Sequence, residues 1–189
     1  MQLSVDDDRR RSRVTVLFRP LLALPHVAWL AAWTPLALLA ALANGVTILA
    51  RGRSSAGLHR FLAAYVRYVA QLNAFTFLVA NPFPGFTGTL PYPVDLAVAG
   101  PEQQRRLTAL LRPILGLPAL VAATVLAAVL AVVGGLAWLA ALATGRAPAK
   151  LCDGGARCIR FLARTHAYHL LLTDSLPWAT PPTPAETQL

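Results

Sequence analysis

Charged residues are scarce in this chain of 189 residues, at 13% of the sequence. A soluble domain of this size carries about 25% charged residues, so much of the polar surface that keeps such a domain in water is missing. Two stretches, residues 20–50 and 113–145, contain no charged side chain at all. Each is longer than the roughly 20 apolar residues that a helix needs to cross a bilayer. The composition therefore indicates a membrane protein.

Residues suited to catalysis are also few. The sequence has eight acidic residues, and it contains no glycine-rich phosphate loop, nucleophile elbow or metalloprotease motif. Its two cysteines, Cys152 and Cys158, have a spacing that fits neither a zinc knuckle nor a thioredoxin-like site. We expect both to be ordinary buried or interfacial thiols. We further expect that the protein is not an enzyme and needs no cofactor.

What the chain does have is an internal duplication with a constant offset of 93 residues. The clearest match is the string Arg19-Pro20-x-Leu22-x-Leu24-Pro25, which recurs from Arg112 to Pro118. The pair Gly52-Arg53 recurs as Gly145-Arg146, and Pro84 recurs as Pro177. A fixed offset over most of a chain is typical of one structural unit used twice.

Each unit has the pattern of a helical hairpin. A short alternating segment, near 3–5 or 92–98, predicts an extended piece, and a long apolar helix follows it. Prolines inside the long helix should bend or restart it. The Gly-Arg pair at its end suits a left-handed glycine cap followed by a cation that faces lipid headgroups. The second helix is amphipathic, with a polar start and an apolar end, and it either spans the membrane within a packed hairpin or lies at the interface.

The predicted fold is an all-α membrane protein, a tandem parallel duplication with about four membrane helices. Two spans per unit would bring both copies into the membrane from the same side, with a pseudo-twofold axis along the membrane normal. The first unit covers 1–93, with spans at about 25–50 and 60–80. The second covers 94–177, with spans at about 118–144 and 156–173. The Pro/Thr-rich segment 178–189 has the composition of a disordered tail.

The net charge of +9 comes from sixteen arginines and one lysine. The arginines flank the apolar stretches instead of forming a basic face with interleaved aromatic residues, so we expect no nucleic-acid binding. Charges at the ends of spans are typical of anionic-headgroup contacts and topology determinants. Their distribution favours a cytoplasmic N-terminus in a multi-pass protein of the bacterial plasma membrane.

Arg67 and Arg160 are the strongest candidate functional residues, because the duplication places both in apolar surroundings. An ionisable group within a membrane segment is a functional candidate by default. The alternative is a structural role, in which the side chain reaches the interface or bonds a carbonyl of a neighbouring helix. Candidate contacts to anionic lipid or to a membrane partner are Arg67, Arg160, Arg164, Arg53, Arg146, Arg19 and Arg112.

A metal site could be drawn from His166 and His169, which lie one helical turn apart near Asp174. The equivalent positions of the first unit are Asn73 and Thr76, which are poor metal ligands. We therefore interpret the two histidines as polar helix-surface residues and predict no metal.

Three motifs give the chain a resemblance to a known family. They are Arg19-Pro-Leu-Leu-Ala-Leu-Pro-His26, Gly145-Arg-Ala-Pro148, and the closing Leu171-Leu-Thr-Asp-Ser-Leu-Pro177. They resemble an uncharacterised family of bacterial membrane proteins that is common in actinobacteria and is classed as a domain of unknown function. In the first unit Asn81-Pro82 stands where the closing motif has Asp174-Ser175. The resemblance implies a multi-span membrane protein and supplies no activity or catalytic residue.

We arrive at three functional hypotheses. The first is a non-catalytic integral membrane protein that acts through anionic lipid headgroups, a membrane-protein partner or a second copy of itself. The second is a subunit of a small transporter or channel, in which Arg67 and Arg160 line a path between the units. The third, a membrane enzyme, needs chemistry that the sequence does not supply.

Overall fold

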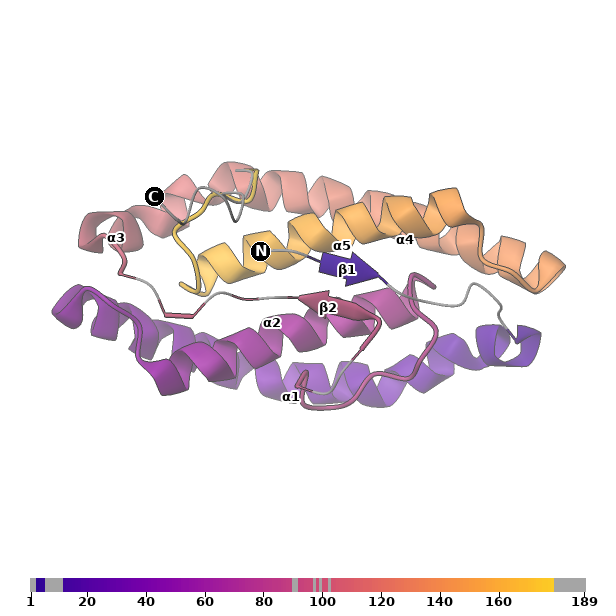
Figure 1. Cartoon of the computed structure of the whole chain (residues 1–189), viewed down its shortest axis with the longest axis horizontal. Helices are drawn as coiled ribbons and strands as arrows, with labels where there is room; N and C mark the ends of the chain where they lie inside the picture. The colour runs from indigo at the N-terminus through magenta and orange to yellow at the C-terminus, as the bar shows by residue number, and fades with distance from the viewer. Residues whose placement is uncertain are drawn as a thin grey trace.

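The computed structural model describes residues 3–5, 12–89, 92–96, 98, 100–101 and 103–178 (Figure 1). This part of the chain forms five helices and two short strands. The elements, in chain order, are β1 (Leu3–Val5), α1 (Arg13–Arg51), α2 (Ala56–Thr76), β2 (Val94–Leu96), α3 (Arg106–Leu115), α4 (Leu117–Thr144) and α5 (Ala149–His169). The strands lie where alternation predicts extended segments. The predicted disordered tail, beyond Trp178, lies outside the described residues.

The two long helices end as the Gly-Arg pairs predict. Gly52 closes α1 with φ 72°, and its N–H donates to the carbonyl of Ile48. Gly145 closes α4 with φ 71°, and its N–H donates to the carbonyl of Ala141. Glycine adopts this left-handed conformation without the steric cost of a side chain. The left-handed glycine caps are therefore confirmed in both units.

The prolines act differently in the two units. In the first unit α1 continues through Pro20, Pro25 and Pro35 over 39 residues. In the second unit the helix is interrupted at Gly116, and Pro118 lies in the first turn of the new helix α4, where a missing N–H costs nothing. Of the three prolines expected to bend or restart the helix, Pro118 marks a restart, whereas α1 continues without a restart at Pro25 and Pro35.

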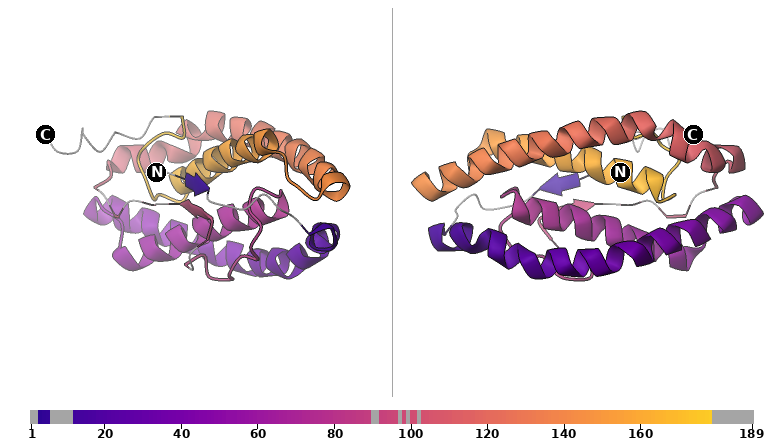
Figure 2. Two further views of the ribbon diagram at one scale, coloured as in Figure 1. Left: turned by 45° about the vertical axis from the view of Figure 1, so that its right-hand side comes forward. Right: turned by 180° about the vertical axis from the view of Figure 1, so that it is seen from behind.

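The helices form two layers. The long helices α1 and α3–α4 lie in one layer, and α2 and α5 lie in the other, together with the two strands (Figures 1 and 2). Each second helix packs on the long helix of its own unit, and α2 packs on α5 across the middle. This central contact contains the largest apolar cluster, which includes Leu62, Val66, Ile159 and Ala163.

The two units are antiparallel, which corrects the predicted parallel duplication. Arg13, at the start of α1, donates to the carbonyl of Ala143 at the end of α4. Arg106, its equivalent at the start of α3, donates to the carbonyl of Ala50 at the end of α1. The pseudo-twofold axis is therefore perpendicular to the long helices.

The sheet obeys the same symmetry. Strands β1 and β2 pair antiparallel, with Leu3 opposite Leu96, and these two positions are 93 residues apart. Because these two residues are equivalents that pair with each other, the pseudo-twofold axis passes between them.

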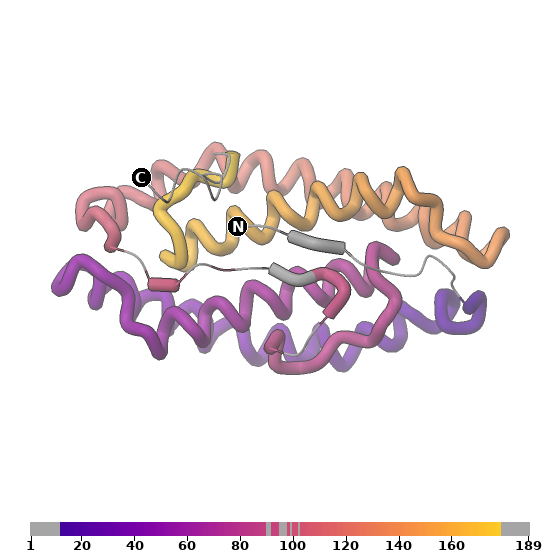
Figure 3. Tube along the Cα trace, viewed as in Figure 1, coloured from indigo at the N-terminus to yellow at the C-terminus, as the bar shows by residue number. Residues whose placement is uncertain are grey.

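The link between the units explains why the parallel prediction is wrong. The chain leaves α2 beside Arg19, whose guanidinium binds the carbonyl of Ala80. By Gln103 it is paired with Arg53, beyond the opposite end of α1. The link therefore runs back along the hairpin before α3 begins (Figure 3), whereas a parallel duplication requires a link that stays at one end.

Two helices in the described residues, α1 and α4, are long and apolar enough to cross a membrane. The predicted spans at 60–80 and 156–173 fall on α2 and α5, which end at Thr76 and His169 and do not reach that apolar character. The four-span expectation is therefore supported for the long helix of each unit only.

Candidate functional site

Arg19 lies in the second turn of α1, yet only 1% of it is exposed. Its Nη1 donates to the carbonyl oxygens of Phe75 at 2.6 Å and Ala80 at 2.9 Å. Its Nη2 donates to Oδ1 of Asn81 at 2.9 Å. The guanidinium carbon lies 4.4 Å from the centre of the Phe75 ring. The residue thus binds the end of α2 and the chain that follows it.

Arg112 makes the corresponding contacts in the second unit and is also 1% exposed. Its Nη1 donates to the carbonyls of Tyr168 at 3.0 Å and Thr173 at 3.1 Å. Its Nη2 donates to Oε1 of Gln104 at 3.2 Å and forms an ion pair with the carboxylate of Asp174. Its guanidinium carbon lies 4.7 Å from the centre of the Tyr168 ring.

These contacts complete the ends of α2 and α5. The last carbonyls of a helix have no partner within the helix and carry partial negative charge. Beyond each helix the chain reverses at a leucine in the left-handed region, Leu78 with φ 59° or Leu171 with φ 61°. A guanidinium is planar and carries five donors, so one arginine can bind carbonyls on both sides of such a turn.

The buried position of Arg19 and Arg112 changes their assignment. Both were candidate contacts for lipid headgroups, but each is enclosed by the chain and directed at its own carbonyl groups. A lipid phosphate would have to displace those bonds and leave buried carbonyls unsatisfied. We therefore remove this pair from the headgroup candidates and assign them to the structure of the hairpins.

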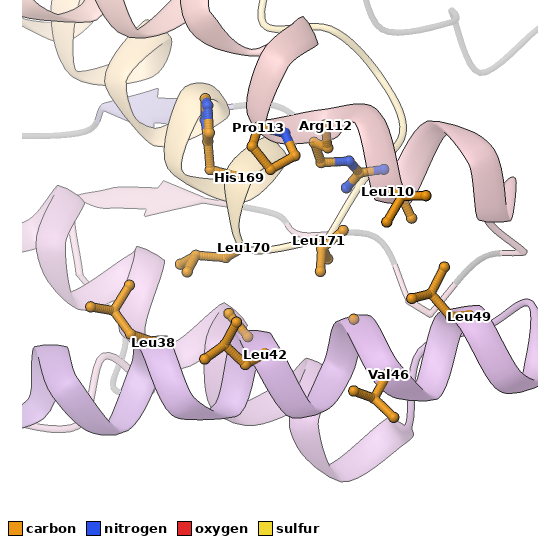
Figure 4. Close-up of a pocket in the computed structure, with 13 residues that line it drawn as sticks. Leu38, Leu42, Val46, Leu49, Leu110, Arg112, Pro113, His169, Leu170 and Leu171 are labelled. Atoms are coloured by element: carbon orange, nitrogen blue, oxygen red, sulfur yellow. The ribbon is translucent and has the colours of Figure 1, made fainter.

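A cavity of about 620 Å³ lies between the second half of α1, helix α3 and the turn that follows α5 (Figure 4). It adjoins the Arg112 site, since Arg112 and Pro113 are part of its lining. The walls are mainly aliphatic, and the side chains that form them include Leu38, Leu42, Val46, Leu49, Leu110, Leu170 and Leu171. Its volume is in the range of ligand sites, about 300–1,000 Å³.

The family of the chain follows from a sequence comparison. One family model, described as a domain of unknown function (DUF4389), matches residues 13–87 and again residues 106–180. The two matches are 93 residues apart, as is the Arg19–Arg112 pair. The chain belongs to the DUF4389 family. Neither a search of curated proteins nor a search of solved structures gives a match.

The other candidate arginines of the two DUF4389 units lie in two kinds of place. Arg53 and Arg146 are exposed beside the glycine caps, at opposite ends of the two-layer structure. Arg67 of α2 and the pair Arg160 and Arg164 of α5 are partly buried on the second layer. The seven candidate arginines thus fall into three groups, which are the buried pair Arg19 and Arg112, the two exposed loop arginines, and the three partly buried arginines of α2 and α5.

The second-layer arginines change the electrostatics around them. Burial lowers the pKa of His59 below its ordinary value of 6.5, and the positive charge of Arg67 lowers that pKa further. Burial likewise lowers the pKa of Arg164, and the neighbouring charge of Arg160 acts in the same direction. A second positive charge is therefore disfavoured in both places.

The described residues contain no cluster of three or more His, Cys, Asp or Glu side chains able to hold a metal. His169 packs against Gly116, and its Nδ1 lies 2.9 Å from the carbonyl oxygen of Thr165 on the preceding turn. Cys152 and Cys158 are free and buried, in agreement with the interpretation of their spacing.

One buried cluster was not found by sequence reasoning. His26 is fully buried, its Nδ1 lies 2.8 Å from the hydroxyl of Tyr68, and its ring stacks on Phe86 at 4.3 Å. Trp29 donates its indole N–H to the carbonyl of Phe86. The Pro-His motif therefore fastens the segment after α2 to α1. The signal in the sequence was a polar side chain, His26, one turn before Trp29 and two turns before Trp33.

Proposed function

We propose that this DUF4389 protein is a non-catalytic membrane protein whose long-helix layer is immersed in hydrocarbon and whose α2–α5 layer contacts anionic headgroups. The observation that carries the proposal is the distribution of exposed apolar side chains. Among the described residues, all but Phe61, Phe83, Phe86 and Trp178 of the exposed large hydrophobic side chains lie on α1, α3 and α4. A soluble monomer rarely exposes so continuous an apolar surface.

Charge is absent from the same surface. Between Val14 and Ala50 the only charged residue is Arg19, and between Leu107 and Thr144 it is Arg112. Both are buried. Each Leu, Ile, Phe or Val that faces lipid contributes about 0.3–0.6 kcal/mol to membrane insertion. Because no charged side chain is exposed between these residues, the long-helix layer strongly favours hydrocarbon over water.

The dimensions favour helices that lie along the membrane over helices that cross it. At about 1.5 Å per residue, the 39 residues of α1 measure roughly 58 Å, almost twice the ~30 Å hydrocarbon thickness. If the long axis crossed the bilayer, the exposed Arg157 and the partly buried Arg160 and Arg164 would lie at the depth of the hydrocarbon core. Inserting each arginine there costs about 2.5–3.5 kcal/mol.

Placed along the membrane, the two-layer structure as a whole is amphipathic. The α1 and α3–α4 layer enters one leaflet, and α2 and α5 lie at the depth of the headgroups. Exposed cations at both ends, including Arg53, Arg146 and Lys150, then face anionic lipid. Each such cation contributes about 1 kcal/mol of attraction to an anionic membrane surface.

A transporter or channel subunit is less well supported, since the described cavity has mainly aliphatic walls that do not suit an ion.

Three exposed positions distinguish the possible orientations. Single cysteines are introduced at Ser12, Arg53 and Arg146 in a background where Cys152 and Cys158 are replaced by alanine. A membrane-impermeant maleimide is then applied to intact spheroplasts and to inverted membrane vesicles. The proposal expects all three positions to react from the same side, because the whole α2–α5 layer faces one aqueous phase.

The other outcomes overturn the proposal in recognisable ways. Reaction of Arg53→Cys from one side and of Ser12→Cys and Arg146→Cys from the other means that α1 and α4 cross the bilayer in opposite directions. Reaction of Ser12→Cys opposite to both loop positions means two parallel hairpins. A chain that stays at the bottom of a flotation gradient with phosphatidylglycerol-containing vesicles is not a membrane protein.

A further inference from the structure

The cavity beside Arg112 has a filled counterpart in the other half of the molecule. The residues equivalent to its lining, 93 positions away in the sequence, lie in the second half of α4, at the start of α1 and in the turn after α2. There Trp138 stands in place of Gly45, and Phe77 stands in place of Leu170. The duplication thus provides an internal comparison between an open and a closed version of one site.

The counterpart is closed by these two aromatic side chains. The indole of Trp138 reaches α1 and donates to the carbonyl of Val16 at 2.8 Å. Phe77 packs so closely on Gly134 that a Cβ at that glycine would lie 2.4 Å from its ring. Leu78 and Ala141 complete a buried apolar cluster at this place. A bulky apolar group therefore fits the space that this pairing of units creates.

From this comparison we infer that the open cavity holds the hydrocarbon chain of a membrane lipid, in the place that Trp138 and Phe77 fill in the other half. The lining is almost entirely aliphatic, which suits a saturated or unsaturated alkyl chain and offers few partners to a polar ligand. Of the two polar residues of the wall, Arg112 donates to the carbonyl of Tyr168, and His169 uses Nδ1 for the carbonyl of Thr165 while its Nε2 lies against Gly116.

Polar contacts fix the turn after α5, which forms one wall of the cavity. The carbonyl of Leu171 accepts hydrogen bonds from Gln104 at 2.9 Å and from Asn44 at 3.4 Å. Asn44 in turn accepts a hydrogen bond from Ser54 at 2.6 Å. Collapse of α3 onto α1 would disturb this buried network. Because protein interiors are close-packed and empty space loses dispersion contacts, a filled cavity is the more stable state.

The position of the cavity indicates where the chain comes from. Leu42, Val46 and Leu110 line it and are also exposed on the long-helix layer. This inference rests on the proposed membrane placement, in which that layer is surrounded by acyl chains. A lipid of the same leaflet can then insert one chain between α1 and α3 while its headgroup stays at the surface.

The test is photo-crosslinking in vesicles of phosphatidylethanolamine and phosphatidylglycerol that contain a phosphatidylglycerol with a diazirine in the middle of one chain. Adducts are located by peptide mass spectrometry. The full-length wild-type protein should carry adducts on Ala41 and Leu170, which line the cavity and are otherwise buried, at higher yield than on the outward-facing Val132 and Leu136 of α4. Equal yield at all of these positions would overturn the inference.

Two variants test the filled counterpart directly. Gly45→Trp should remove the adducts in the cavity and leave those on Val132 and Leu136 unchanged, whereas the control Gly45→Ala should retain both. Trp138→Gly should create new adducts on Val16, Ala137 and Ala141, which are buried in the wild-type protein. Persistence of the cavity adducts in a folded Gly45→Trp protein contradicts the assignment.

Failure of this inference and failure of the membrane proposal give different results. If the protein floats with vesicles and its outer apolar face is labelled but the cavity is not, only the lipid-chain assignment is wrong. If it neither floats nor is labelled anywhere, the membrane placement itself is wrong.

Discussion

Arg112 forms an ion pair with Asp174, in which 2% of the arginine side chain and 33% of the aspartate side chain is exposed. At the equivalent point of the first unit, Arg19 binds the neutral side chain of Asn81. The same geometry therefore tolerates a charged or an uncharged acceptor. The common requirement is an oxygen that holds the segment after the second helix against the buried guanidinium.

The first prediction concerns this acceptor. Asp174→Asn reproduces the chemistry of the first unit and should lower the free energy of unfolding by about 1 kcal/mol or less, whereas Asp174→Ala removes the acceptor and should cost about 1.5–3 kcal/mol. Thermal unfolding in detergent measures both. An equal loss in the two variants would mean that the charge of Asp174, and not its hydrogen bond, is what matters.

The second prediction concerns the two arginines themselves. Arg19→Lys and Arg112→Lys should each destabilise the protein by about 3–5 kcal/mol, because an ammonium group cannot reproduce the planar fork and leaves buried carbonyls without donors. Arg53→Lys is the matched control on the surface and should change stability by no more than about 0.5 kcal/mol. Retention of full stability by both buried variants would refute the structural role.

The third prediction compares two glycines with positive φ. Gly52 has φ 72° and open space where a Cβ would lie, so Gly52→Ala should cost about 1–2 kcal/mol, the penalty of the left-handed conformation alone. Gly88 has φ 65°, and a Cβ there would lie 2.3 Å from the carbonyl oxygen of Ala64. Gly88→Ala should therefore be clearly the more damaging of the two, as judged by thermal unfolding.

The fourth prediction tests the antiparallel arrangement without reference to a membrane. Spin labels at positions 12 and 144 should lie within about 20 Å of each other, because Arg13 contacts the end of α4. Labels at positions 12 and 51 should be separated by about 55–60 Å, the length of α1. Electron–electron double resonance in detergent measures both distances. A long first distance would mean that the two units are not antiparallel.

The sequence was informative wherever a local pattern decides the outcome. The offset of 93 residues revealed the duplication, and the glycines at positions 52 and 145 revealed where the long helices end, since a left-handed cap depends on a few neighbouring residues. Of the described helices only α1 and α4 are long and apolar enough to cross a membrane, whereas a span on α5 was expected by analogy with the first unit.

Nothing in the sequence indicated that Arg19 and Arg112 are buried. Buried arginines require several acceptors, and those acceptors lie at Phe75 and Ala80, or at Tyr168 and Thr173, more than 50 residues further along the chain. The arginines resembled headgroup contacts because they precede the apolar stretches. Only the packed hairpin brings the helix-end carbonyls to them.

By itself, the sequence determined the repeated unit, its helical content and the glycine caps, because these depend on periodicity and local conformational preference. The tertiary structure decided the direction of one unit against the other, the role of the buried arginines and the existence of the cavity beside Gly45. Each of these depends on which distant surfaces meet. That outcome is set by the path of the link between α2 and α3, and the link has no repeating pattern that a sequence could reveal.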